Sequence, residues 1–182
     1  MNRKRKYFLG ILLTLILFVN LGCGNATEKG NTSTVFPLEN LQTKDGEFQY
    51  KNVPFGSSSE EAMKQIPEKL EKMEGEDSSA VSYYSKDSFD FYGCDAVLFL
   101  DFYKDKLEST KIQFNLKEGE EQFQKILTDL TDLYGEPQTS GSEGESFTSE
   151  IYSWGKDSTR LQAILLKKES TASAVIGIFK IN

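Results

Sequence analysis

Side chains able to act as nucleophiles are plentiful in this chain, whereas the bases that activate them are scarce. Ser153 and Lys156 match the spacing Ser-x-x-Lys, a nucleophile–base pair that enzymes hold at the start of a helix so that both side chains share one face. Here the pair falls at the end of an expected strand and in a glycine turn, so we interpret the match as chance. The chain has no histidine, which excludes Ser-His-Asp and Cys-His catalysis and every histidine-ligated metal site.

Carboxylates remain as candidates for general acid and base work. Two well-placed carboxyl groups would serve a hydrolase that cleaves sugars, but with 28 acidic residues such pairs arise by chance. The Asp-x-Asp-x-Asp-Gly loop of a calcium site is missing, and residues 141–144 lack the Gly-Lys-Ser/Thr ending of a phosphate loop. We therefore expect no catalytic residue, no metal and no cofactor. The aspartates that recur through the aromatic region, and that we assign to solvated strand faces and turns, are Asp87, Asp90, Asp95, Asp101 and Asp105.

Aromatic residues are dense in the middle of the chain. Eight of the 19 aromatic residues after position 22 fall between residues 83 and 103. Most of them, like the single Trp154, should belong to a core, because burial is the default for aromatic side chains. The functional alternative is that some tyrosines lie on an open sheet face and bind a peptide, protein or sugar, since tyrosine offers a large apolar area and a polar tip. The eight are Tyr83, Tyr84, Phe89, Phe91, Tyr92, Phe99, Phe102 and Tyr103.

The N-terminus has the order of a secretory signal. Four basic residues at 3–6 precede an uncharged apolar run over 7–19, and the small residue Gly22 follows soon after. A helix over the apolar run would be roughly 20 Å long, which is shorter than the ~30 Å hydrocarbon core of a bilayer. A signal peptide is therefore favoured over a permanent membrane span.

Residues 21–23, Leu-Gly-Cys, resemble the lipobox of bacterial lipoproteins, with Asn20 where that family usually has leucine. The resemblance implies that Cys23 receives a diacylglycerol and that the chain is cut before it, so that residues 1–22 are a lipoprotein signal peptide and Cys23 anchors the protein. The alternatives are a plain secretory signal or an uncleaved anchor, with Cys23 as an ordinary thiol. If Cys23 carries lipid, Cys94 has no disulfide partner and is expected to be a small core residue.

The mature chain would be acidic and of single-domain length. Removing residues 1–22 takes away four of the 21 basic side chains and none of the 28 acidic ones, which leaves a net charge of −11. Such a balance argues against nucleic acid as a partner, because phosphate binding needs clustered Lys and Arg. The polar stretch over 23–47 is expected to be a flexible tether, in which Val35, Phe36 and Leu38 are candidates to dock on the domain. Residues 48–182 are expected to be a single domain.

Two helices are expected in that domain. After a short strand over 49–55, Ser57 with Glu60, or Ser58 with Glu61, forms a capping box. Apolar residues then continue at helical spacing to Met73, with a kink or a second helix start at Pro67. The second helix runs from about residue 118 to Tyr134, with glutamates at its start and a Gly-x-Pro stop.

The remaining segments alternate or carry β-branched and aromatic residues, which predicts strands. A polar loop is expected over 138–146. The predicted strands are 80–85, 88–92, 96–103, 110–116, 147–154, 160–166 and 174–181.

The order of elements predicts an α+β fold, in which two amphipathic helices pack on one face of an antiparallel sheet. Each half of the domain is predicted to contain a helix followed by strands, so two repeats are expected. Residues 54–62 and 130–137 resemble the repeats of the β-lactamase-inhibitor-protein family and of the small outer-membrane-assembly lipoproteins. That resemblance implies a role in binding or assembly rather than catalysis.

The resulting functional expectation is a membrane-anchored envelope lipoprotein. Its domain would face the extracytoplasmic side, carry palmitate-type lipid on Cys23 and bind a protein or envelope component without catalysis. The alternative is a lipid-anchored, carboxylate-dependent hydrolase acting on cell-wall material. A small-molecule-binding lipoprotein that feeds a transporter is disfavoured by length, because such proteins usually have two α/β lobes.

Overall fold

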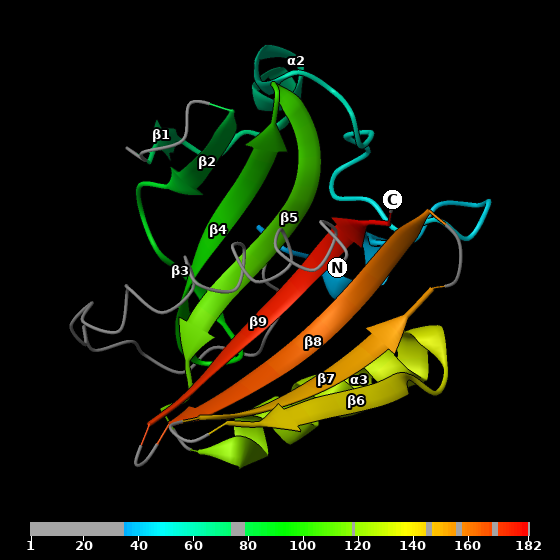
Figure 1. Cartoon of the computed structure of the whole chain (residues 1–182), viewed down its shortest axis with the longest axis vertical. Helices are drawn as coiled ribbons and strands as arrows, with labels where there is room; N and C mark the ends of the chain where they lie inside the picture. The colour runs from blue at the N-terminus through cyan, green and yellow to red at the C-terminus, as the bar shows by residue number, and fades with distance from the viewer. Residues whose placement is uncertain are drawn as a thin grey trace, which may run out of the picture.

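The computed structural model describes residues 35–73, 79–117, 119–144, 147–155, 158–168 and 171–181. Within these ranges the chain forms one nine-stranded sheet with two α-helices and a short 3-10 helix, η2 (Leu38–Asn40) (Figure 1). The helices are α2 (Ser59–Gln65) and α3 (Glu120–Tyr134). The strands are β1 (Leu70–Lys72), β2 (Ala80–Ser85), β3 (Phe89–Phe91), β4 (Cys94–Tyr103), β5 (Lys106–Asn115), β6 (Gln138–Glu143), β7 (Thr148–Trp154), β8 (Thr159–Lys168) and β9 (Thr171–Lys180).

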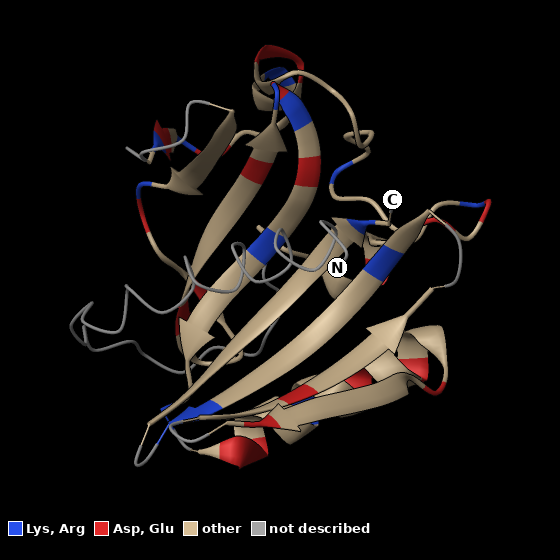
Figure 2. Cartoon of the chain, viewed as in Figure 1, with Lys and Arg blue, Asp and Glu red and all other residues tan. Residues whose placement is uncertain are grey.

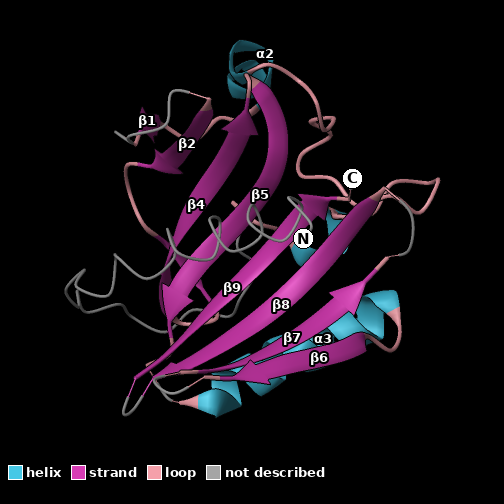
Figure 3. Ribbon diagram, in the orientation of Figure 1, coloured by secondary structure: helices cyan, strands magenta, loops and turns pink. Residues whose placement is uncertain are grey.

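All strand pairs in this sheet are antiparallel, as the alternating segments predict. The order is β1-β2-β4-β5-β9-β8-β7-β6, and β3 pairs with the start of β4 (Figure 3). The fold is therefore dominated by the sheet. Of the two capping boxes considered at the start of α2, the one between Ser58 and Glu61 forms. Among the described residues, no helix is long and apolar enough to span a membrane.

The main core lies between the sheet and α3. The helix buries one stripe of its surface, including Phe123, Ile126 and Leu130, and each such side chain contributes about 1.5–3 kcal/mol by leaving water. Glu120 and Glu121 occupy its first turn (Figure 2), where carboxylates favour the helix dipole. The helix ends at Gly135, which has a φ of 81° and donates its N–H to the Thr131 carbonyl.

The core extends further toward the N-terminus than the expected domain start at residue 48, and it includes Phe36 and Leu38, two of the predicted docking residues. Phe36 and Leu41, inside the expected tether, are 0% and 1% exposed. The Tyr134 hydroxyl donates a hydrogen bond to the Leu38 carbonyl and accepts one from the Leu41 N–H at 3.3 Å. The boundary of the packed domain thus lies near residue 36 rather than 48. The apolar side chains of this arm follow no period, so their burial carries no sequence signal beyond their type.

Three local predictions are wrong. Residues 49–55 form an isolated bridge between Tyr50 and Val53 rather than a strand. The first helix stops at Gln65, and the segment after Pro67 becomes β1, in which Leu70 pairs with Ser85. Proline removes a backbone donor and ends the helix completely. The expected loop over 138–146 contains β6, which pairs with β7. All six residues of this edge strand are exposed, so it forms without an apolar face.

A β-bulge in the β4–β5 hairpin decides which side chains share a face. Lys104 and Asp105 form its tight turn, both at positive φ. From that turn Tyr103 pairs with Lys106, but the register shifts by one residue between Asp101 and Phe102. Beyond the shift, Phe99 pairs with Lys111. Because side chains alternate along a strand, the bulge turns Lys111 away from the core.

Candidate functional site

The side chains that point away from α3 form a surface that we call the second face. In Figure 1 this face is turned toward the viewer, and α3 lies behind β7 and β6. The paired positions of neighbouring strands share a face, so the registers define its members. From β2 to β8 they include Ser82 and Tyr84; Val97, Phe99, Asp101 and Tyr103; Ser109 and Lys111; Val175, Gly177 and Phe179; and Arg160, Gln162, Ile164 and Leu166.

An ion pair lies at the centre of the β2–β4–β5 part of this face. Lys111 Nζ lies 2.5 Å from Asp101 Oδ2, and the two side chains are 9% and 20% exposed. The Ser82 hydroxyl donates to Asp101 Oδ1 at 2.7 Å, and the Ser109 hydroxyl donates to Oδ2. The carboxylate on β4 is thus held by three donors from its two neighbouring strands, β2 and β5.

Desolvation by itself would raise the pKa of Asp101. The Lys111 ammonium and the hydrogen bonds from Lys111, Ser109 and Ser82 outweigh it, and the pKa of Asp101 is held below its ordinary value. Asp101 is therefore an engaged, ionised group at neutral pH. It does not have the raised pKa that a general acid needs.

This lowered pKa predicts how stability depends on pH. A carboxylate whose pKa is lower in the folded state contributes stability that is fully present above the unfolded pKa and is lost as pH falls through the folded one. We expect the free energy of unfolding of the wild type to exceed that of Asp101→Asn by a constant amount from about pH 5 to 7, and the gap to shrink below about pH 4. Urea denaturation across this range measures the gap. A gap that widens on acidification would contradict the assignment.

Gly177 makes room for this arrangement. It pairs with Lys111 across β5 and β9, and a Cβ at position 177 would lie 2.8 Å from Lys111 Cβ and 2.9 Å from the Phe179 ring. We expect Gly177→Ala to lower the free energy of unfolding by about 1–3 kcal/mol through overpacking. Ser173→Ala, on the same strand and face, is the matched control and should stay within about 0.5 kcal/mol. If urea denaturation gave the same free energy of unfolding for both variants, the overpacking at position 177 would be contradicted.

Apolar and aromatic side chains share the second face with the ion pair. Val175 and Ile164 are buried at the centre of the face, while Tyr84 and Phe99 are half-buried, with ring centroids 6.4 Å apart. Lys111 Nζ also lies 5.8 Å from the Phe99 ring centroid, within range of a cation–π contact. Tyr103, 40% exposed, extends the aromatic group toward the hairpin turn. We call Tyr84, Phe99 and Tyr103 the aromatic group of the second face.

The dense aromatic segment is therefore divided between the two sides of the sheet. The aromatic group of the second face holds three of its eight members. The others belong to the core or pack against it: Tyr83, Phe89, Phe91, Tyr92 and Phe102. The prediction that most of these aromatic residues belong to the core is confirmed. Among the tyrosines, Tyr84 and Tyr103 lie on the other face of the sheet.

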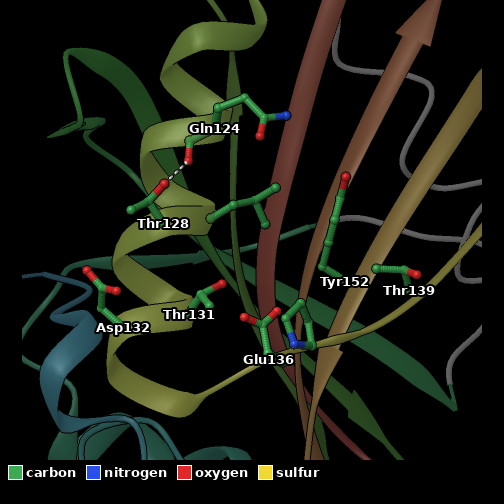
Figure 4. A pocket seen from close by; sticks show the side chains of 9 residues that line it. Gln124, Thr128, Thr131, Asp132, Glu136, Thr139 and Tyr152 are labelled. Carbon is green, nitrogen blue, oxygen red and sulfur yellow. Dashed lines mark hydrogen bonds between the residues drawn. The ribbon is translucent and has the colours of Figure 1, made fainter.

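A separate open groove of about 360 Å³ lies on the other side of the sheet, between α3 and the start of β6. Figure 4 shows Tyr152 and Thr139 projecting from the sheet, Gln124 and Thr131 projecting from α3, and Glu136 between them. Its two charged lining residues are both acidic. The lining consists of Gln124, Leu127, Thr128, Thr131, Asp132, Glu136, Pro137, Thr139 and Tyr152.

The cysteine predictions have different outcomes. Cys94 is buried, and burial raises the pKa of its thiol, as expected for a core residue rather than a reactive one. Cys23 lies outside the described residues, so its role as a lipid attachment site stays a prediction.

The Ser-x-x-Lys pair gains no support from the structure. Ser153 lies on β7 and accepts a hydrogen bond from the Gln162 amide at 3.0 Å, while Lys156 lies outside the described residues. The segment 141–144 is the end of β6 and the residue after it, not a loop.

The aspartates are dispersed. Asp95 pairs with Lys117 at 3.0 Å, and Asp105 accepts the N–H of Ser59 at the start of α2. Asp87 and Asp90 are exposed. Within the described ranges, no three or more His, Cys, Asp or Glu side chains gather in a way that could hold a metal ion.

Sequence reasoning did not single out Lys111, Gly177 or Ser109. Their position beside Asp101 depends on the bulge, for which the sequence carries no signal that we recognise. In comparisons with known proteins, no protein-family model, curated protein or solved structure matches the chain.

Proposed function

We propose that this protein is a non-catalytic envelope lipoprotein, anchored in the cell membrane through lipid on Cys23. Its domain would lie on the extracytoplasmic side and bind another protein or an envelope component through the second face of the sheet. The anchor rests on the order of basic, apolar and Leu-Gly-Cys residues at the N-terminus.

The observation that carries the binding role is the composition of the second face. Aromatic side chains share this face with one fixed ion pair, and Tyr103 and Tyr84 offer apolar rings with polar tips. Interfaces favour this combination of aromatic residues with few charges at the centre. A rigid sheet also presents such a surface without the entropic cost of ordering loops.

The rival hydrolase is less well supported. A glycosidase of this kind needs one carboxyl group with a raised pKa to protonate the leaving group. Among the described residues, the carboxyl groups whose pKa is displaced are all displaced downward: Glu47, Glu61, Glu71, Asp101, Asp105 and Glu150. Hydrogen bonds to hydroxyl, N–H or ammonium groups favour their charged forms.

The strand order supports the inference that the domain consists of two helix-plus-strands repeats with both helices on one face. The strands of each half pair with one another, in the order β2-β4-β5 in the first half and β7-β8-β9 in the second. The last strands of the two halves, β5 and β9, pair antiparallel at the centre of the sheet. The same arrangement supports the resemblance to binding and assembly proteins built of such repeats.

The binding role is tested by photo-crosslinking in intact cells. A photoreactive amino acid replaces Tyr103 in one strain and Leu133 in another. These residues are 40% and 42% exposed, and they lie on β4 and on α3. We expect position 103 to capture the same species repeatedly, and Tyr84→Ser to abolish that capture. No capture at 103, or equal capture at 133, would contradict the proposal. Turnover of cell-wall sugar that is lost on changing one Asp or Glu would favour the hydrolase.

A further inference from the structure

The two edges of the sheet differ in how they are protected from pairing. At one edge, β1 has only three residues, two of them charged. At the other edge, β6 has six residues, all of them exposed. Natural edge strands are usually shortened, bulged, or blocked with lysine or proline. The sequence of β6, Gln-Thr-Ser-Gly-Ser-Glu, has neither of these residues, and its register with β7 shows no bulge.

The free side of β6 is defined by its hydrogen bonds. Gly144 donates its N–H to the Phe147 carbonyl, which continues the ladder with β7 beyond the strand. Because the backbone N–H and C=O groups of successive residues point to opposite sides of a strand, those of residues 138, 140 and 142 also point toward β7. Thr139, Gly141 and Glu143 therefore direct their N–H and C=O groups outward. In the described part of the chain, no strand pairs with that side.

The acidic groove lies directly beside this edge. Thr139 of β6 lines it, and α3 forms the opposite wall through Gln124 and Thr128 (Figure 4). A strand added to β6 would direct every second side chain toward this wall. The charged residues of the lining are both acidic, and Glu136 is the one whose side chain lies between the helix and the sheet (Figure 4). The groove thus favours a positively charged side chain.

We propose that β6 binds an extended segment of a partner protein as an additional strand, with a Lys or Arg of that segment directed toward Glu136. Main-chain hydrogen bonds to Thr139, Gly141 and Glu143 would supply affinity, and the groove would supply specificity. This site goes beyond the proposed function, because it uses the edge of the sheet and leaves its second face free.

A second copy of this chain is a poorer occupant than a basic segment. In symmetric antiparallel pairing of two β6 strands centred on Gly141, Glu143 of the copy would lie opposite Thr139, beside the groove that Glu136 lines. Like charges placed opposite one another are destabilising. Charge complementarity therefore selects a basic partner over self-association.

The test uses the full chain purified in detergent and an alternating threonine–lysine peptide long enough to span β6. The same peptide with glutamate in place of lysine is the control ligand. Thr139→Pro removes an outward N–H while leaving the ladder with β7 intact, and Thr139→Val keeps that N–H. Glu136→Lys reverses the charge of the groove, and Asp87→Lys makes the same change on the far side of the sheet. Binding is measured by calorimetry and by amide hydrogen exchange.

We expect the lysine peptide to bind, to slow exchange at Thr139 and Gly141, and to bind at least tenfold more tightly than the glutamate peptide. Thr139→Pro and Glu136→Lys should each weaken binding at least tenfold, whereas Thr139→Val and Asp87→Lys should not. Absence of saturable binding, protection elsewhere in the sheet, or an unchanged affinity of Thr139→Pro would overturn the proposal. Concentration-dependent protection of β6 without peptide would identify a second copy as the occupant instead. None of these outcomes alters capture at Tyr103, so the two proposals fail independently.

Discussion

Asp101→Asn is expected to lower the free energy of unfolding by about 2–4 kcal/mol at neutral pH, because it leaves a largely buried ammonium without a counter-charge. Lys111 is 9% exposed and has the Asp101 carboxylate as its ion-pair partner at 2.5 Å. The amide oxygen can accept from one of the two serine hydroxyls and the amide N–H can donate to the other, so the loss reports mainly on charge. Urea denaturation at pH 7 gives the value.

Two comparisons isolate the ion pair. Asp101→Leu combined with Lys111→Met removes both charges and should cost less than Asp101→Asn, because a buried pair replaced by apolar groups leaves no unpaired charge. Glu60→Gln breaks the exposed pair with Lys64, whose side chains are 81% and 69% exposed, and should cost under about 0.5 kcal/mol. If Asp101→Asn were as mild as Glu60→Gln, the ion pair would have no structural importance.

Cys23→Ala is expected to abolish incorporation of labelled palmitate and to cause the uncut, 182-residue precursor to accumulate. Alanine has no thiol to form the thioether with diacylglycerol, and the resemblance to lipoproteins implies that acylation precedes cleavage. The measurement is metabolic labelling of cells followed by electrophoresis of the membrane fraction.

Cys94→Ala is the matched control for this change. Its thiol is buried in the core of the domain, so lipid incorporation and processing should be unaffected. Labelling that persists in Cys23→Ala, or that is lost in Cys94→Ala, would exclude Cys23 as the attachment site.

The parts of the fold that the sequence predicts are those in which periodicity and burial agree. The stripe of apolar residues in α3 and the alternation along β5 each match one side of the core. Gly135 at the helix stop and Asp105 in the 104–105 turn are residue types that such positions favour. Local chemistry and tertiary packing select the same structure in these segments.

The segments that sequence reasoning misses are those in which the tertiary context decides. Leu41 packs in the core from an arm without periodicity. The polar β6 is a strand because β7 offers a free edge, not because its own residues favour one. Leu70 and Met73 continue a helical spacing, yet the chain after Pro67 pairs with β2 instead.

The candidate site illustrates the same limit. Without a bulge, the 104–105 turn would place Lys111 opposite Leu98, on the core side of the sheet. The shift at Asp101 and Phe102 places it opposite Phe99. A difference of one residue in register therefore decides whether Asp101 has an ion-pair partner. Composition and spacing carry no information about that shift.

The most direct test of the central claim is the intact mass of the protein extracted from the membrane fraction of the cells that produce it. The account predicts the mass of residues 23–182 plus a diacylglycerol, with or without a third acyl chain. That result would restrict the search for the partner of the second face to the surface of the membrane. A mass equal to the full chain, or to an unmodified cleavage product, would contradict the account and would leave Cys23 as a free thiol.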